Sequence, residues 1–222
     1  MPVLTVIAGP NGSGKSTLIA ALRSQGVDFG AYFNADDVAA SLTGPPIEVV
    51  RQAQEMVREK RAEALDKGID HSFETVMSHV SHIEYMRAAR AGGFEVRLFF
   101  VATDKPEINL GRVANRVAHG GHDVPQDRIV SRYFRCLENL PSAIAASDLA
   151  WIFDNSQSDL PHRLLAEIGY SHLRHCGSVI AGDKFDGPYI GLEVNPEHIP
   201  AWWLSILLQI KPDDPYRYGP LP

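Results

Sequence analysis

The sequence is poor in cysteine, and it has neither an excess of positive charge nor a long apolar run. Its two cysteines, Cys136 and Cys176, stand among 222 residues. They fit neither a disulfide framework nor a paired-cysteine metal site, so we expect two reduced thiols. The formal net charge of −6 gives no overall field that would attract nucleic acid or an anionic membrane. An anion bound by this chain must therefore be held by a local positive feature.

Export signals and membrane spans are also missing from the pattern. No charged stretch followed by an apolar one opens the chain, so we expect no secretory signal. The longest apolar stretch near the end, residues 199–210, is too short to span a bilayer. These features predict a cytoplasmic protein.

The overall composition is that of a globular protein. Hydrophobic residues make up 45% of the chain and charged residues 22%, which is close to the averages for globular domains and excludes a disordered chain. The length predicts one domain, or one domain with an appendage.

Short apolar runs and amphipathic stretches alternate along residues 1–156. The expected strands are 3–8, 31–34, 69–74, 95–102 and 149–153, and the expected helices are 15–23, 46–67, 82–91, 106–118 and 127–146. This alternation predicts an α/β fold with a parallel sheet and helices on both faces. Ligands in such sheets bind beyond the carboxyl ends of the strands.

Residues 157–222 lack this alternation, and we expect them to form a C-terminal extension packed on the core. The expected segments are a strand or helix at 162–170, a small hairpin at 178–194, a short apolar helix at 200–210 and a Pro-rich tail. In the helix, Trp202 and Trp203 together with Leu207 and Leu208 are expected to cover an edge of the core. The alternative is an exposed partner-binding patch.

A glycine-rich segment directly follows the first expected strand. Residues 9–16, Gly-Pro-Asn-Gly-Ser-Gly-Lys-Ser, fit the P-loop pattern G-x-x-x-x-G-K-[ST] in the strand-to-helix context that it needs. Glycines let the backbone N–H groups of such a loop curl into an anion cradle, and the helix N-terminus adds partial positive charge. The expected nucleotide contacts are Gly9, Pro10, Asn11, Gly12, Ser13, Gly14, Lys15, Ser16 and Thr17.

Within this loop two side chains have distinct expected roles. Lys15 reaches the β- and γ-phosphates as a point charge, and Ser16 supplies a hydroxyl to Mg²⁺. The motif predicts a nucleoside triphosphate but does not say what receives its phosphate. The sequence has no Asn-Lys-x-Asp segment, which disfavours a GTPase, and the one candidate for the acidic strand of a helicase-type ATPase, residues 149–154, comes late in the chain.

Carboxylates follow the second and third expected strands, at the same sheet edge as the P-loop. Asp36 and Asp37 could take the proton of an acceptor hydroxyl, as a kinase base does, or they could cap a helix together with Asn34. Glu74, followed by Thr75, could orient the acceptor, hold a Mg²⁺-bound water, or cap the next helix.

Arginines cluster around a glycine-rich turn at 120–125. They are Arg112, Arg116, Arg128, Arg132 and Arg135. Their spacings of three or four residues place pairs on one helix face, so two helices at 106–147 would form an arginine-rich lid that closes on the triphosphate. A solvated basic face and an RNA-phosphate site are the alternatives, although no aromatic residues interleave for base stacking. His119, His122 and Asp123 lack a further ligand at metal-site spacing.

The ordered set of these motifs resembles the zeta toxin family, and within it the compact bacterial branch of predicted ATPases. The resemblance rests on the P-loop, Phe33-Asn-Ala-Asp-Asp-Val-Ala39, Ser72-Phe-Glu-Thr75, Arg112-Val-Ala-Asn-Arg-Val117, Gly120-Gly-His-Asp-Val-Pro125 and Arg132-Tyr-Phe-Arg135. It covers about residues 1–156.

The resemblance implies a P-loop kinase fold and a kinase activity with ATP and Mg²⁺. Characterised members phosphorylate the 3′-hydroxyl of UDP-N-acetylglucosamine, and an antitoxin protein restrains them. Matched by motif, the resemblance implies Asp36 as general base and Glu74 with Thr75 as acceptor contacts. It places the charge-stabilising arginines between residues 112 and 135, where we select Arg116 and Arg132.

The sequence therefore predicts a cytoplasmic kinase that phosphorylates a hydroxyl on a small molecule such as UDP-N-acetylglucosamine. Two other classes stay open. One is an ATP-hydrolysing switch or motor without a small-molecule acceptor. The other is a nucleotide-stabilised interaction protein whose contact surface is the aromatic C-terminal segment 195–222.

Overall fold

The computed structural model describes residues 1–121, 123–170, 188–192, 199–209 and 217–220. Its strands are β1 (Val3–Ala8), β2 (Ala31–Phe33), β3 (His71–Thr75), β4 (Glu95–Ala102), β5 (Leu149–Asp154), β6 (Arg163–Tyr170), β7 (Pro188–Leu192) and β8 (Arg217–Pro220). Its helices are α1 (Lys15–Ser24), α2 (Ala35–Ala40), α3 (Pro46–Asp66), α4 (Ser81–Ala91), α5 (Pro106–Ala118), α6 (Gln126–Ala145) and α7 (Ala201–Leu207).

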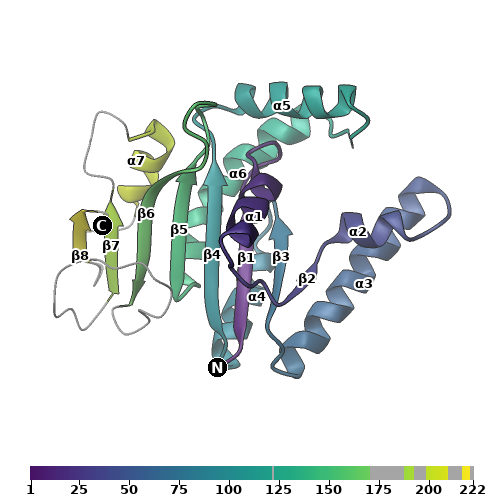
Figure 1. Cartoon of the computed structure of the whole chain (residues 1–222), viewed down its shortest axis with the longest axis horizontal. Helices are drawn as coiled ribbons and strands as arrows, with labels where there is room; N and C mark the ends of the chain where they lie inside the picture. The colour runs from purple at the N-terminus through teal and green to yellow at the C-terminus, as the bar shows by residue number, and fades with distance from the viewer. Residues whose placement is uncertain (122, 171–187, 193–198, 210–216, 221–222) are drawn as a thin grey trace.

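All these strands belong to one sheet, in the order β2-β3-β1-β4-β5-β6-β7-β8 (Figure 1). The first five are parallel, with Val6 of β1 opposite Phe73 of β3 and Leu98 of β4. The expected α/β fold with a parallel sheet is thus confirmed. Strand β6 then runs antiparallel to β5, β7 antiparallel to β6, and β8 parallel to β7.

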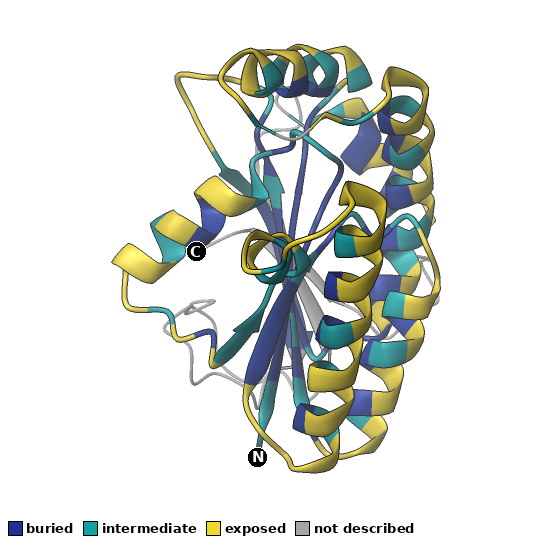
Figure 2. Cartoon of the chain, turned by 90° about the vertical axis from the view of Figure 1, so that its right-hand side faces the viewer, coloured by how far each residue is buried: buried dark blue, intermediate teal, exposed yellow. Residues whose placement is uncertain are grey.

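Two hydrophobic clusters fill the two faces of the sheet. Helices α4, α6 and α7 pack against one face, whereas α1 packs against the other around Ile7, Phe99 and Trp151. Buried residues accordingly line the strands and the sheet-facing sides of the helices, and exposed residues lie outward (Figure 2). The central strands carry apolar residues on both faces, because helices cover a parallel sheet on both sides.

The region around residue 156 links the parallel strands to the C-terminal elements. Residues 163–170, which the pattern left open between strand and helix, form strand β6. In α7, Trp202 and Trp203 are buried in the core, Trp202 beside Phe100, and Leu207 packs against this core. This confirms the expected cover of a core edge for these three residues. The expectation was wrong for Leu208, which is 76% exposed just beyond the last turn of the helix. The expected hairpin at 178–194 lies largely outside the described residues, and the division of the chain at 156 stays a prediction.

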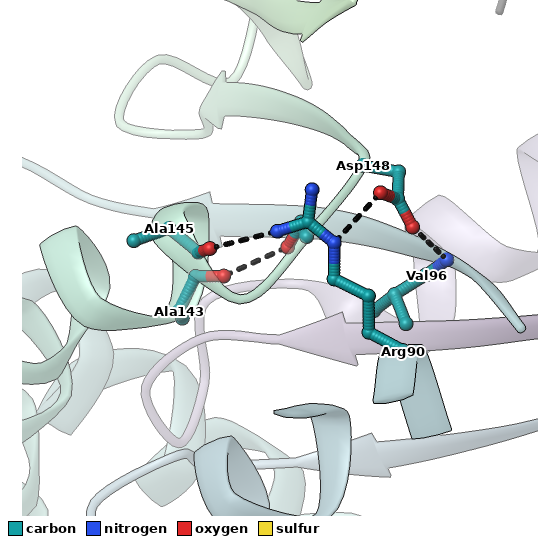
Figure 3. Close-up of polar contacts among 6 residues, drawn as sticks. Arg90, Val96, Ala143, Ala145 and Asp148 are labelled. Atoms are coloured by element: carbon teal, nitrogen blue, oxygen red, sulfur yellow. Dashed lines mark hydrogen bonds and ion pairs between the residues drawn. The ribbon is translucent and has the colours of Figure 1, made fainter. Parts of the chain in front are cut away.

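A polar contact joins the end of α4 to the start of β5. The Arg90 guanidinium lies 2.9 Å from Asp148 Oδ1 and also donates to Ala145 O, as Figure 3 shows. The other oxygen of Asp148 accepts a hydrogen bond from the backbone N–H of Val96 at 2.9 Å. The Arg90–Asp148 pair thus connects the end of α4, the end of α6 and the first residues of β4.

Helices α2 and α3 form an arm that projects from the β2 edge of the sheet (Figure 1). Helix α5 lies across the end of the sheet where the parallel strands terminate, close to the segment between β1 and α1. Across the described part of the chain, no helix has both the length and the low charge needed to cross a bilayer.

Candidate nucleotide site

The P-loop connects the buried end of β1 to α1. Its first glycine, Gly9, has a φ of 148°, and a Cβ there would lie 2.0 Å from Val101 O. Its last glycine, Gly14, is the N-cap of α1 with a φ of 102°. The first N–H groups of α1 have no partner within the helix. The loop therefore presents backbone donors and the positive end of a helix at the carboxyl edge of the sheet.

Lys15 is bonded back onto this loop. Its Nζ donates to Gly9 O at 2.9 Å and to Pro10 O at 3.0 Å. Burial lowers the pKa of Lys15 from its usual value; the nearby Arg116 also lowers it, whereas Glu74 acts in the opposite direction. The ammonium group is thus held at the loop, near one acidic and one basic side chain of the predicted site.

Glu74 lies at the centre of a small hydrogen-bond network. Its Oε2 accepts from Ser16 Oγ at 3.3 Å, and its Oε1 accepts a short bond from the Tyr32 hydroxyl. Burial, followed by the neighbouring Glu74 carboxylate, raises the pKa of Tyr32. The structure therefore brings together a P-loop residue, the end of β3 and the middle residue of β2.

Asp36 and Asp37 lie in the first turn of α2, both exposed. The side chain of Asn34 accepts the backbone N–H of Asp36 at 3.0 Å, so Asn34 is the helix cap. The Asp37 carboxylate is close enough to help raise the pKa of Tyr32. This turn consequently belongs to the same edge as Glu74, but among the described residues the Asp36 carboxylate makes no hydrogen bond. Its role as the base stays a prediction.

Thr75 differs from Glu74 in its surroundings. It is 7% exposed, its hydroxyl oxygen accepts from Met77 N at 2.9 Å, and its carbonyl accepts from Gly9 N at 3.2 Å. Both groups thus stabilise the turn after β3 and its contact with the P-loop.

The arginines of α5 and α6 have different environments. Arg116 is exposed and acts electrostatically on Lys15, whereas Arg132 is half-buried on α6. Arg112 is also half-buried; its Nη1 is shielded from solvent and has no hydrogen-bond partner among the described residues. Burial lowers the pKa of the nearby His162 ring, and the charge of Arg112 acts in the same direction. Arg112 is therefore the arginine of α5 with an unused buried donor beside the P-loop.

Arg128 and Arg135, the other two arginines of the block, are exposed on α6, and Arg135 donates to Ser131 O of its own helix at 3.2 Å. Of the histidine and aspartate group considered for a metal, His122 lies outside the described residues. The described residues contain no group of three or more His, Cys, Asp and Glu side chains that could hold a metal ion.

The oxygen donors next to the P-loop suit the magnesium that accompanies ATP. The Ser16 hydroxyl and the Glu74 carboxylate lie 3.3 Å apart, and hydroxyl and carboxylate oxygens are what Mg²⁺ accepts as ligands beside phosphate and water. Ser16, which the motif selects for this role, would hold the ion, with Glu74 next to it.

Three residues that the motifs did not indicate contact the P-loop directly. Asn109 of α5 donates to Asn11 O at 2.6 Å, Asn155 after β5 donates to Ser13 O at 2.7 Å, and His162 before β6 bonds Gly14 O at 3.1 Å. The only sequence sign was that Asn155 follows the end of a strand. Tyr32 was likewise missed, because a tyrosine within an apolar run is typical of a strand.

Solved structures share the fold of this chain. The structure resembles a solved complex of AvrRxo1-ORF1 and AvrRxo1-ORF2 with ATP, at a TM-score of 0.58 and 19% identity, over 75% of this chain and 58% of that chain. It also resembles a structure from the PezAT chromosomal toxin–antitoxin system of Streptococcus pneumoniae, at a TM-score of 0.56 and 16% identity, over 75% of this chain and 71% of that chain. Both likenesses concern the fold.

The sequence comparisons concern the family. An uncharacterised protein of Haemophilus influenzae is 31% identical over 128 residues, which are 56% of this chain and 88% of that protein. The profile of the zeta toxin family matches residues 45–160, a range that includes Glu74, the arginines of α5 and α6, and Asn155. The family that the motifs indicated is confirmed: the chain belongs to the zeta toxin family.

Proposed function

We propose that this protein is a kinase that transfers the γ-phosphoryl group of ATP to a hydroxyl of a small molecule, with UDP-N-acetylglucosamine as the first acceptor to test. The observation that carries the proposal is the Ser16–Glu74–Tyr32 network. It places a carboxylate that is held from two sides directly beside the phosphate end of the P-loop. A carboxylate at that position can accept a hydrogen bond from a second substrate, as phosphoryl transfer requires.

The proposed roles follow from position and charge. The P-loop N–H groups and Lys15 hold the phosphates, and Asp36 takes the proton of the acceptor hydroxyl. Glu74, with the turn at Thr75, positions the acceptor. Mg²⁺, when bound with ATP, neutralises phosphate charge.

The arginines would stabilise the negative charge of the transferring phosphoryl group. Arg116 is exposed on α5, close enough to Lys15 to affect its pKa, and Arg132 is half-buried on α6. Guanidinium groups that contact the transferring phosphoryl group lower the barrier of such reactions. We include Arg112 in this proposal, because its buried Nη1 is without a partner among the described residues.

The test is phosphorylation of a panel of sugar nucleotides with labelled ATP, read by mass spectrometry. Wild type should add one phosphoryl group to one acceptor. Asp36→Asn should lower kcat by about 10²–10⁴-fold, the usual contribution of a general base, and leave ATP affinity nearly unchanged. Asp37→Asn, which changes the neighbouring acid of the same turn, should retain most of the activity.

Other outcomes identify other functions. Hydrolysis of ATP without any acceptor, unchanged in Asp36→Asn, would remove the kinase proposal and indicate a switch. ATP binding without turnover would indicate an interaction protein.

We also propose an antitoxin protein as a partner, and the cytoplasm, where ATP and sugar nucleotides occur, as the place of reaction. Support for a partner comes from the likeness to a protein of a toxin–antitoxin system. Co-purification with the product of the adjacent gene, followed by an activity assay with and without it, tests this.

A further inference from the structure

Side chains from two distant parts of the chain bond to carbonyl oxygens of the P-loop. Asn109 Nδ2 donates to Asn11 O at 2.6 Å, and Asn155 Nδ2 donates to Ser13 O at 2.7 Å. The His162 ring bonds Gly14 O through Nε2 at 3.1 Å. Because a carbonyl oxygen only accepts, Nε2 carries the hydrogen in this contact.

Each of these three side chains is itself fixed. Asn109 is fully buried, and its Oδ1 accepts a short bond from the Thr103 hydroxyl. Asn155 is 7% exposed, and its Oδ1 accepts from the backbone N–H of His162 at 3.3 Å. In each amide the oxygen accepts a hydrogen bond that fixes the side chain, and the nitrogen donates to the P-loop. Both polar atoms of each amide are therefore used.

Thr103 is in turn fixed from α6, where the Tyr133 hydroxyl donates to Thr103 O at 2.7 Å. His162 has a φ of 52°, a conformation that costs a non-glycine residue about 1–2 kcal/mol. The β5–β6 turn holds it there, at the position from which its ring reaches Gly14.

The geometry of the peptide group decides what these bonds do. In a planar trans peptide, the C=O of one residue and the N–H of the next point in opposite directions. Asn109 and Asn155 hold the carbonyls of Asn11 and Ser13. At Gly14 O, His162 is a second donor beside the N–H of Leu18, which lies 3.0 Å away. The N–H groups of Gly12, Gly14 and Lys15 therefore point away from these donors. The described residues offer no backbone acceptor to the N–H groups of Gly12 and Gly14.

We propose that Asn109, Asn155 and His162 are positioning residues that aim the N–H groups of the P-loop at the phosphates of the bound nucleotide. The inference rests on the proposed function in that the ligand is a nucleoside triphosphate. It adds that the cradle is preorganised by α5 and by the β5–β6 turn, so that the loop does not have to be ordered when the ligand binds.

A matched pair of variants at His162 tests this. His162→Gln keeps an N–H donor at the reach of Nε2, whereas His162→Phe keeps the ring and loses the donor. Both side chains meet the same backbone at φ 52°, so the conformational cost cancels in the comparison. By isothermal titration, ATP should bind about tenfold or more weakly to His162→Phe, since an aligned donor set is lost, and within about threefold of wild type to His162→Gln.

Asn155→Asp provides a second test should His162→Phe not fold. It replaces the donor at Ser13 O by an acceptor of the same shape while keeping the acceptor for His162 N. We expect a similar loss of ATP affinity. His79→Gln, an exposed histidine outside the site, is the control and should bind ATP as wild type does.

A ligand-free readout separates this inference from the proposed function. In ¹H–¹⁵N spectra without nucleotide, the amide signals of Gly14 and Lys15 should shift in His162→Phe and return toward wild type in His162→Gln. Wild-type ATP affinity in both His162→Phe and Asn155→Asp, with unmoved amide signals, would overturn the inference and leave the kinase proposal intact. If wild type binds no nucleotide, the kinase proposal fails. The amide signals alone then show whether His162 orients the peptide group between Gly14 and Lys15.

Discussion

At position 14, both the backbone conformation and the packing require glycine. Its φ is 102°, and a Cβ would lie 2.3 Å from Asn155 Nδ2 and 3.1 Å from His162 Nε2. We expect Gly14→Ala to weaken ATP binding at least about tenfold, because the methyl group would push both side chains off the loop. Gly111→Ala on α5 has open space around the new Cβ and is the control. Equal ATP affinity of the two variants by titration would contradict this reading.

His82 predicts a pH dependence of stability. Burial, followed by the charges of Arg61 and His79, lowers the pKa of His82 from 6.5 to about 4. Between pH 6.5 and 4 the unfolded chain binds this proton and the folded chain does not, so the free energy of unfolding falls as the pH falls. The full loss is at most roughly 3 kcal/mol, at about 1.4 kcal/mol per pKa unit.

The measurement is urea unfolding of wild type and His82→Phe from pH 7 to pH 4. The phenylalanine keeps a ring next to Phe73, whose ring centroid lies 5.8 Å from that of His82. The difference in unfolding free energy between the two proteins should shift in favour of the variant as the pH falls. A difference that stays constant with pH would contradict the lowered pKa of His82.

At this scale the sequence predicts contacts that lie close together along the chain and misses those that do not. The P-loop residues are contiguous, so the motif alone was enough to select Lys15 and Ser16 as candidates. Asn109 and Asn155 are separated from their P-loop partners by 98 and 142 residues, and a single asparagine has no spacing that would indicate such a contact. Glu74 could be named, but its partner Tyr32 could not.

Elements are joined through the Asp148 carboxylate, whose side chain is 15% exposed. Asp148→Ala removes the acceptor of Val96 N and leaves Arg90 without its partner acid, so we expect a loss of about 1–3 kcal/mol in unfolding free energy. Asp148→Asn retains an acceptor for Val96 N and loses only the ion pair, so its loss should be smaller. Chemical unfolding of the two variants gives the order; a larger loss in the asparagine variant would contradict it.

The helices of the arginine-rich block show what hydrophobic periodicity can and cannot predict. The ranges of α5 and α6 follow from their apolar spacing and their flanking prolines. The same periodicity places Cys136, Leu140 and Ile144 in the core, so the second half of α6 is part of the body of the fold. Burial raises the pKa of the Cys136 thiol to about 12, which agrees with the expected reduced, unreactive cysteine. Which arginines lie next to the P-loop depends on how α5 packs against it, and the periodicity of a single helix does not contain this information.

At the scale of the whole molecule, α7 belongs to the hydrophobic core. Trp203 is 1% exposed, whereas Leu208 just beyond the helix is 76% exposed. We expect Trp203→Ala to lower the unfolding free energy by about 3–5 kcal/mol and Leu208→Ala to change it by less than about 0.5 kcal/mol. Thermal or urea unfolding checks this. Equal stabilities would show that the C-terminal helix does not contribute to the folded core.

The direction of the strands could be predicted only as far as β5. Five helix-linked strands predict parallel pairing, but the reversal into β6 is set by the short connection at residues 155–162, for which the pattern gave no direction. That reversal matters for the site, because both ends of the connection contact the P-loop.

The two contacts from the β5–β6 connection also set an order of events at the ribosome. The P-loop is made among the first residues, but Asn155 and His162 join it only across 142 and 148 residues of chain. Because synthesis proceeds from the N-terminus, the P-loop is present in the growing chain long before Asn155 and His162 can bond to it. A chain that stops before residue 155 therefore lacks two of the three side-chain contacts that we propose to position the P-loop.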